Sequence, residues 1–229
     1  MGGLTRLSTC DWPGQLAATV FCQGCAWDCP YCHNPGLRPT RAPGQSPVPV
    51  AWDSVLAFLS SRRGLLDAVV FSGGEPTLQP VLLEAVGEVR RLGFRVGLHT
   101  AGMNPEPLRQ LLPSLDWVGL DVKAPFADYA RITGVQQSGE RALASLRHLL
   151  GSGVEYEVRT TWHPALLSLE DLCRLKEELG SLGVTHYVVQ RFRSQGARPL
   201  LPAVKEFPEL QKFTAQCAFS EAFLRFEIR

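Results

Sequence analysis

Two kinds of hydrophobic pattern alternate along the chain: short segments of strand length, and longer segments in which apolar residues recur at helical spacing. Nearly continuous apolar runs of strand length occur at 16–22, 65–71 and 117–121, and further segments of strand length at 95–99, 155–161 and 186–190 are also predicted to be strands. Longer segments with apolar residues at helical spacing lie between them, at 52–61, 78–92, 105–112, 139–150 and 168–182. Continuous apolar runs are typical of strands covered on both faces in a parallel sheet, so the alternation predicts about six β/α units.

This number of units predicts an open α/β structure. A closed barrel of this type has eight units, and we therefore expect a partial (β/α)6 TIM-like barrel, open on one side. A chain of 229 residues is long enough for one such domain over 1–229. In the C-terminal extension, from about residue 200 to 229, a helix at 206–219 and an apolar stretch at 223–228 are expected to pack against the barrel edge.

Composition limits the partners of this domain. The formal net charge is +1 and 45% of residues are hydrophobic, as in an ordinary globular protein. The chain therefore lacks the excess of positive charge that is typical of proteins that bind nucleic acid or an anionic membrane. No apolar stretch approaches 18 residues, and Met1–Arg6 has neither a signal-peptide core nor a myristoylation pattern. We expect a cytoplasmic protein without nucleic-acid or membrane partners.

Four of the seven cysteines, Cys22, Cys25, Cys29 and Cys32, lie within eleven residues after the first apolar run. A disulfide between such near neighbours would close a small strained ring. Zinc ribbons separate their two Cys pairs by roughly 15–20 residues, and ferredoxins use a different cysteine order. The pattern favours an iron–sulfur cluster, with Cys22 at the end of the strand as a buried core thiol rather than a fourth ligand.

The spacing Cys25-x3-Cys29-x2-Cys32 resembles the motif of the radical S-adenosylmethionine (radical SAM) superfamily, and the fold expected above is of its type. The resemblance implies a 4Fe–4S cluster held by these three cysteines, with S-adenosylmethionine bound at the fourth iron and cleaved to a 5′-deoxyadenosyl radical. Cofactors then carry the difficult chemistry. His33-Asn34-Pro35 narrows the resemblance to activators of glycyl radical enzymes. It also implies that Tyr31 contacts the cofactor.

Further candidate binding residues follow the predicted strands, at the C-terminal ends where β/α folds place their reactive groups. In Gly73-Gly74-Glu75-Pro76 the glycines would let backbone groups approach a ligand. The resembled family uses this motif for the methionyl ammonium, which Glu75 would pair; the alternative is a strand-ending turn. His99 and Thr100 end the next strand. Thr100 is assigned to cofactor binding, whereas His99 replaces an aspartate that helps those activators bind a monovalent cation.

Charged residues end the later strands. Asp121 and Lys123 are either a solvated ion pair or, by resemblance to pyruvate formate-lyase activators, contacts to S-adenosylmethionine or an incoming peptide, which would give Lys123 a catalytic role. Arg159 could hold the methionyl carboxylate through its fork. His163 is assigned to the cofactor or to structure.

Three segments remain after these assignments. Gln190 and Arg191 are candidates for adenine or partner contact. Cys173 and Cys217 are interpreted as core thiols. The loop from Pro35 to Pro49 contains five prolines and is expected to be a passive linker, a lid or a docking loop.

Nearly the whole chain resembles the short activating proteins of anaerobic ribonucleoside-triphosphate reductase. The implied reaction is hydrogen abstraction from a glycine of a glycyl radical enzyme, with a low-potential flavodoxin or ferredoxin as electron donor. A radical SAM enzyme for a small molecule, such as a 7-carboxy-7-deazaguanine synthase, is the alternative. A non-catalytic iron–sulfur electron carrier or interaction module would leave Gly73–Pro76 and the barrel-length chain unexplained.

Overall fold

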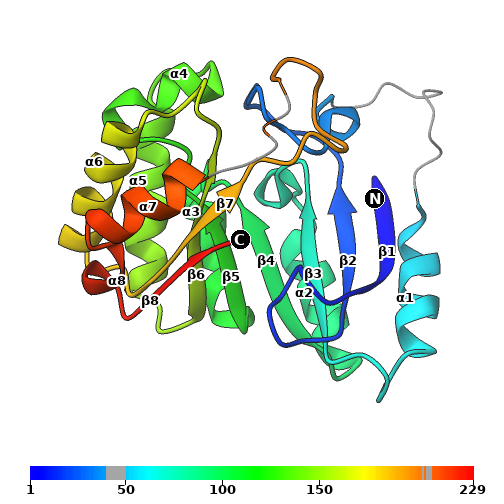
Figure 1. The fold of residues 1–229 in the computed structure, drawn as a ribbon. Helices are drawn as coiled ribbons and strands as arrows, with labels where there is room; N and C mark the ends of the chain where they lie inside the picture. The colour runs from blue at the N-terminus through cyan, green and yellow to red at the C-terminus, as the bar shows by residue number, and fades with distance from the viewer. Residues whose placement is uncertain (40–49, 203, 205–207) are drawn as a thin grey trace.

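One eight-stranded sheet organises the computed structural model, which describes residues 1–39, 50–202, 204 and 208–229 (Figure 1). The strands lie in sequential order: β1 (Gly3–Ser8), β2 (Ala17–Cys22), β3 (Ala68–Gly73), β4 (Arg95–Thr100), β5 (Trp117–Asp121), β6 (Glu155–Trp162), β7 (His186–Arg191) and β8 (Arg225–Ile228). β1 is antiparallel to β2, and every later neighbour is parallel. The six predicted strands are β2 to β7. Because β1 and β8 do not pair with each other, the barrel is open on one side, as predicted.

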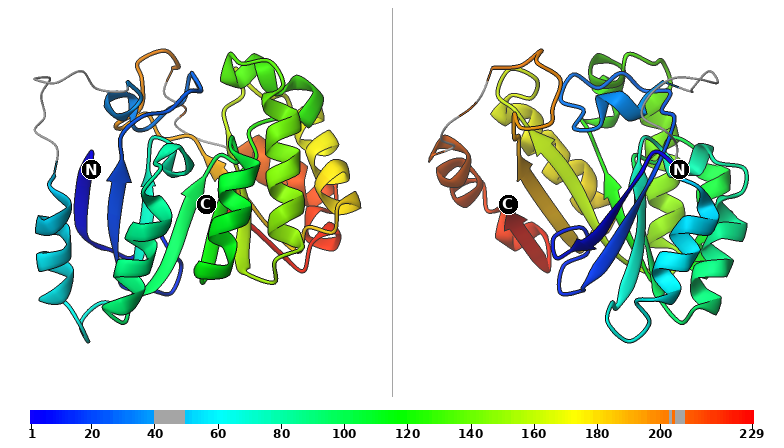
Figure 2. Two further views of the ribbon diagram at one scale, coloured as in Figure 1. Left: turned by 180° about the vertical axis from the view of Figure 1, so that it is seen from behind. Right: turned by 90° about the vertical axis from the view of Figure 1, so that its right-hand side faces the viewer.

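Helices fill the crossovers between the parallel strands. They are α1 (Trp52–Ser60), α2 (Leu82–Arg91), α3 (Pro105–Leu111), α4 (Tyr129–Thr133), α5 (Ser138–Leu150), α6 (Leu169–Ser181), α7 (Pro208–Gln216) and α8 (Phe219–Ala222), with short 3₁₀ turns at Pro35–Leu37, Pro76–Leu78, Leu112–Ser114 and Phe126–Asp128. Helices α2, α3 and α5 lie behind the sheet in Figure 1 and in front of it in the reversed view of Figure 2. No helix among the described residues is long and apolar enough to span a membrane.

Alternate residues along the strands pack into two different apolar clusters. On β3, Val69 and Phe71 belong to the large core that includes the helices, whereas Val70 packs into a smaller cluster with Trp12 and Trp117. The two indoles stack with ring centroids 5.4 Å apart. This stack fills the inner side of the barrel at the amino-terminal ends of the strands, so the opposite ends remain available for a polar site.

The sequence-based boundaries were wrong at several places. The strand predicted from 65 begins at Ala68, because Leu65 lies in a turn and is 64% exposed. The single C-terminal helix is two helices, since Ala218 adopts a left-handed conformation between them (φ +50°). The apolar stretch that follows pairs in parallel with β7 as β8, and therefore extends the sheet instead of only packing on its edge.

Two further elements were not predicted. β1 was missed because its sequence GLTRLS has no continuous apolar run, and α4 was missed because it is only five residues long. The Pro-rich loop predicted at 35–49 lies outside the described residues from 40 onward.

Candidate active site

A cavity of about 430 Å³ lies where the parallel strands end. Its wall joins the cysteine loop to residues from the ends of β3, β4, β5, β6 and β7. The residues predicted from sequence that line it are Cys25, Tyr31, Cys29, Cys32, Gly73, Gly74, Thr100, Asp121, Lys123, Arg159, Gln190 and Arg191. The loops after β2 and β7 lie side by side near the ends of the strand arrows in Figures 1 and 2, and the Arg198 backbone N–H donates to the Cys32 carbonyl.

The three motif cysteines share this cavity as free thiols. Burial raises the pKa of Cys25 to about 11 and also raises the pKa of Cys29. Buried thiolates therefore need a compensating cation, and coordination to iron deprotonates a thiol outright. Among the described residues, no three His, Cys, Asp or Glu side chains surround a point that a single ion could occupy. The donor set fits a cluster whose several irons space the sulfurs apart.

Cys22 has a different environment. It is fully buried at the end of β2 and is not part of the cavity wall. Burial raises its pKa to about 12, so it remains a protonated thiol in the core. This is the position that the strand pattern predicted.

Gly73 and Gly74 line the cavity, but their lack of a side chain also has an internal cause. Gly73 has φ +113°, and a Cβ on it would lie 2.5 Å from the backbone of Cys22. A Cβ on Gly74 would lie 2.1 Å from the carbonyl oxygen of Gly24. From the sequence, both glycines were expected to lack a side chain so that a ligand could approach the backbone. The structure shows that the base of the cysteine loop already requires them.

Asn34 connects the cysteine loop to the same glycines. Its side-chain amide donates to the Gly73 carbonyl at 3.2 Å, and it lines the cavity. His33 also lines the cavity, and its Nε2 donates to the Arg193 carbonyl at 2.9 Å. The sequence analysis used both residues only as marks of resemblance, and their contacts give them a role in holding the loop.

Glu75 is buried and engaged on both carboxylate oxygens. Oε1 accepts from the Thr77 backbone and hydroxyl and from the Thr100 hydroxyl, whereas Oε2 accepts from the Ala101 N–H at 2.9 Å. Burial raises the pKa of Glu75 despite these donors. Neither Glu75 nor Pro76, which begins a 3₁₀ turn, lines the cavity. The predicted pairing of Glu75 with an ammonium is therefore not supported, and its carboxylate instead joins the ends of β3 and β4.

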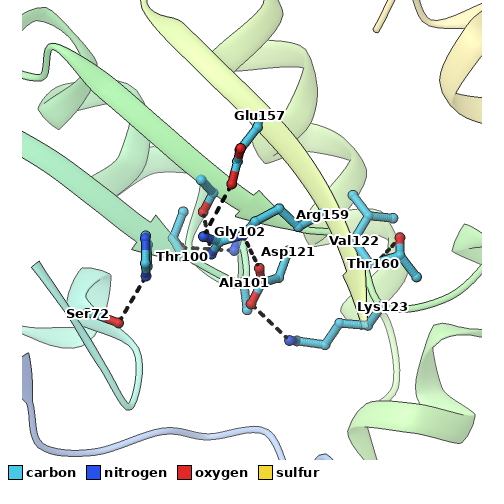
Figure 3. A network of polar contacts seen from close by, with 12 residues as sticks. Ser72, Thr100, Ala101, Gly102, Asp121, Val122, Lys123, Glu157, Arg159 and Thr160 are labelled. Carbon is cyan, nitrogen blue, oxygen red and sulfur yellow. Dashed lines mark hydrogen bonds and ion pairs between the residues drawn. The ribbon is translucent and has the colours of Figure 1, made fainter. Parts of the chain in front are cut away.

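Asp121 lies between two cations (Figure 3). Its Oδ1 accepts from Arg159 Nε at 2.8 Å, and its Oδ2 is 3.6 Å from Lys123 Nζ. Burial alone would raise the pKa of Asp121, but the charges of Arg159 and Lys123 outweigh burial and lower it. Both cations therefore stabilise the Asp121 carboxylate, and in the pair with Lys123 the lysine is buried while Asp121 is partly exposed. Lys123 also lies over the ring of Tyr31, 5.5 Å from its centroid, so it connects the strand end to the cysteine loop.

Arg159 is bound on several sides. Its Nη2 donates to the Gly119 carbonyl at 3.3 Å, and its Nη1 is 3.9 Å from Glu157 Oε1. With Nε on Asp121, two of its five N–H groups make hydrogen bonds within the chain, and Nη1 only approaches Glu157. These bonds hold Arg159 beside Asp121, whose carboxylate it positions, and the contact of Arg159 with the methionyl carboxylate stays a prediction.

The two predicted histidines have different positions. His99 lines the cavity, contacts the Asp11 carbonyl at 2.6 Å and Ser72 at 3.3 Å, and has a pKa lowered to about 4 by burial and by the charge of Arg159. His163 is not part of the cavity wall. Its Nδ1 accepts from the Ala165 N–H, so its Nε2 carries the proton and donates to the Pro202 carbonyl. These contacts give His163 a structural role and do not support the predicted cofactor contact.

Several wall residues were not predicted. Glu157 and Thr161 flank Arg159 at alternate positions of β6, and Arg229 reaches Glu157 with its Nη2 3.0 Å from Oε2. Period-two polar residues within an otherwise buried strand were a signal available in the sequence. The contact of Arg229 with Glu157 had no local signal, because the two residues lie 72 positions apart.

An open β/α barrel with three free thiols at the carboxyl edge of its sheet defines an enzyme class that binds an iron–sulfur cluster beside an organic cofactor. The family model of the radical SAM superfamily matches residues 19–167, and the chain belongs to that superfamily. Its members use a 4Fe–4S cluster and S-adenosylmethionine, so the cofactors expected from the cysteine motif are confirmed at the family level.

Individual relatives are similar over much of the chain. A Methanocaldococcus jannaschii protein assigned by name to the glycyl-radical enzyme activating enzymes is 29% identical over 86% of this chain and 81% of its own. The pyruvate formate-lyase-activating enzyme of Clostridium pasteurianum is 30% identical over 72% of this chain and 68% of its own. A 7-carboxy-7-deazaguanine synthase of Methanopyrus kandleri is 32% identical, over 49% of this chain and 51% of its own.

Solved structures share the fold. Streptococcus suis SuiB bound to S-adenosylmethionine superposes with a TM-score of 0.69 at 12% identity, covering 92% of this chain and 49% of that chain. Native anSMEcpe with bound AdoMet gives a TM-score of 0.66 at 15% identity, covering 92% of this chain and 63% of that chain. At these identities the likeness concerns the fold alone.

Proposed function

We propose that this chain activates a glycyl radical enzyme by abstracting a hydrogen atom from a glycine α-carbon of that partner. The observation that carries the proposal is the set of relatives named as activating enzymes, one of them aligned over 86% of the chain. The cavity supports it, because it brings the three thiols together with Asn34 of the His-Asn-Pro sequence.

Each part of the cavity wall has a role in this proposal. Cys25, Cys29 and Cys32 hold the cluster, while Gly73 and Gly74 offer backbone groups to the methionyl end of S-adenosylmethionine. Once bound, these two cofactors supply one-electron reductive cleavage and the hydrogen-abstracting radical. Tyr31, Lys123 and Asp121 orient the cofactor or the incoming peptide from the other side.

The favoured partner is anaerobic ribonucleotide reductase, and the expected electron donor is a flavodoxin or a ferredoxin. An open barrel suits a protein substrate whose loop must reach the cavity, whereas small substrates are normally enclosed. Gln190, Arg191 and Arg193 lie at the end of β7 and line the cavity. Because they are polar and line the cavity, these side chains are suited to contact the substrate.

The test is to mix the anaerobically reconstituted, reduced protein with S-adenosylmethionine and the reductase. We expect 5′-deoxyadenosine together with a carbon-centred doublet in electron paramagnetic resonance. The doublet should disappear when the reductase glycine is changed to alanine. If 5′-deoxyadenosine formation instead requires a small metabolite, and no glycyl radical enzyme tested acquires a radical, a small-molecule enzyme resembling the 7-carboxy-7-deazaguanine synthases replaces this proposal.

Cysteine variants test the cluster assignment. Cys25→Ala, Cys29→Ala and Cys32→Ala should each abolish cleavage of S-adenosylmethionine, because each removes one of three iron ligands. Cys22→Ala, at the end of β2 just before the loop, is the matched control, and it should retain the cluster because its thiol is buried away from the cavity. Iron content and low-temperature electron paramagnetic resonance report the result. A cleavage-competent cluster in Cys29→Ala would overturn the assignment.

A further inference from the structure

Two cysteines far from the cavity face each other across a helix junction. Cys173 lies in α6 and Cys217 directly follows α7, 44 positions later, with their sulfur atoms 3.7 Å apart. Both are free and half-buried. Both were interpreted from the sequence as core thiols. Cys217 does pack against the core, but the fold also brings the two thiols together at a partly exposed position.

The backbone on both sides of this pair is already held in place. Lys176, one turn after Cys173 in α6, donates from Nζ to the Cys217 carbonyl at 2.8 Å. The same ammonium lies 5.7 Å from the ring centroid of Phe219, which is fully buried. The sulfurs, now 3.7 Å apart, need to approach by about 1.7 Å to bond. The Lys176 contact holds α6 and the segment after α7 together while the sulfurs approach.

We propose that Cys173 and Cys217 form a redox-active dithiol, which is converted to a disulfide by exchange with a low-molecular-weight disulfide. One cysteine loses its proton, and its thiolate attacks the small disulfide to give a mixed disulfide and one free small thiol. The second cysteine, also deprotonated, attacks the protein sulfur of the mixed disulfide and releases the other small thiol. The protein pair loses two electrons and two protons, and the small disulfide gains them.

The bond would restrain the part of the chain that forms one wall of the cavity. The closed loop contains β7, and the segment fastened by Cys217 continues into α8 and β8. β8 is the edge strand that pairs with β7, and Arg229 just beyond it contacts Glu157 in the cavity. Oxidation therefore fixes the open edge of the sheet. This inference does not depend on the proposed partner or reaction.

The experiment uses the cluster-loaded protein, so that the motif cysteines are occupied, and oxidised glutathione as the probe. After incubation, alkylation and proteolysis, mass spectrometry should find the Cys173 and Cys217 peptides cross-linked, with both thiols lost to alkylation. Amide hydrogen exchange in 208–228 should slow by about tenfold in the cross-linked form, because cross-linking limits local opening.

Serine variants provide the controls. Cys173→Ser and Cys217→Ser should each remove the cross-link and leave the remaining cysteine alkylated or glutathionylated. Cys22→Ser, at a buried thiol with no role in this pair, should keep the cross-link. Glutathione adducts on both Cys173 and Cys217 without a cross-link, or full alkylation of both in the presence of oxidised glutathione, would overturn the proposal.

Discussion

Gly74 has the closest approach to another backbone in the site. A Cβ there would lie 2.1 Å from the Gly24 carbonyl oxygen, a contact that backbone atoms cannot relieve by side-chain rotation. We expect Gly74→Ala to displace the base of the cysteine loop and to destabilise the fold by about 1–3 kcal/mol, the usual cost of forcing an extra methyl group into a packed site.

Iron content after reconstitution and the free energy of urea unfolding measure this effect. Gly87→Ala is the matched control, because a Cβ at Gly87 meets nothing within 4 Å and the residue lies in α2. It should bind iron normally and should not lose stability. Normal iron content in Gly74→Ala would show that the loop can move away from a side chain at this position.

His99 should make stability depend on pH. Its folded pKa of about 4 lies below the unfolded value near 6.5. The stability that it contributes is present above pH 6.5 and is lost as the pH falls toward 4, because the unfolded chain takes up a proton that the folded chain excludes. Between pH 7 and pH 5 the loss should be about 2 kcal/mol.

Urea unfolding of the native chain and of His99→Asn, at both pH values, isolates this contribution. The variant lacks the titrating group, so the difference in unfolding free energy between the two proteins should change by about 2 kcal/mol. Parallel pH dependences of the two proteins would mean that folding does not lower the pKa of His99.

At the scale of elements, Glu75 joins two strand ends. Its carboxylate accepts from the 3₁₀ turn after β3 and from Thr100 and Ala101 at the end of β4. Glu75→Gln replaces one acceptor by a donor, and at least one of these buried partners must lose its bond, at a cost of about 1–3 kcal/mol.

The free energy of unfolding and the affinity for S-adenosylmethionine should therefore separate two roles of Glu75. A loss of stability with affinity reduced less than about threefold fits the structural role. Loss of affinity without loss of stability would restore the ammonium contact predicted from the sequence. Glu84→Gln, at an exposed position in the first turn of α2, is the control and should change neither quantity.

Elements with strong local patterns could be predicted, whereas long-range partners could not. The strands predicted at 95–99, 117–121 and 186–190 match β4, β5 and β7 within one residue, because each is a strand-length segment with apolar residues at its centre that lies between segments of helical spacing. The cysteine motif and the strand-end residues identified about half of the cavity wall. Three contacts could not be predicted from the sequence, because each depends on the tertiary structure. They are the hydrogen bonds that occupy both carboxylate oxygens of Glu75, the ion pair of Arg159 with Asp121, and the contact between Cys173 and Cys217.

At the scale of the whole molecule, the barrel is open along one side but filled at the amino-terminal ends of its strands. Trp12 comes from the turn between β1 and β2 and stacks on Trp117 of β5, so it connects an edge of the sheet to its centre. Arg95 on β4 lies over the Trp12 ring, 5.5 Å from its centroid. The stack therefore lies between the polar cavity, at the carboxyl ends of the strands, and the solvent at their amino-terminal ends.

We expect Trp12→Ala to lower the free energy of unfolding by about 3–5 kcal/mol, because a large buried ring is lost and a cavity remains between the strands. Trp12 is 3% exposed, and its removal should also let water reach the neighbouring Trp117. Urea unfolding compares Trp12→Ala with the native chain. Acrylamide quenching of Trp117 compares Trp12→Ala with Trp12→Phe, in chains whose other three tryptophans are changed to phenylalanine. Leu65→Ala, at a residue that is 64% exposed, is the control and should change neither the free energy of unfolding nor the quenching of Trp117. Unchanged quenching together with a loss below about 1 kcal/mol would mean that other residues close this end of the barrel.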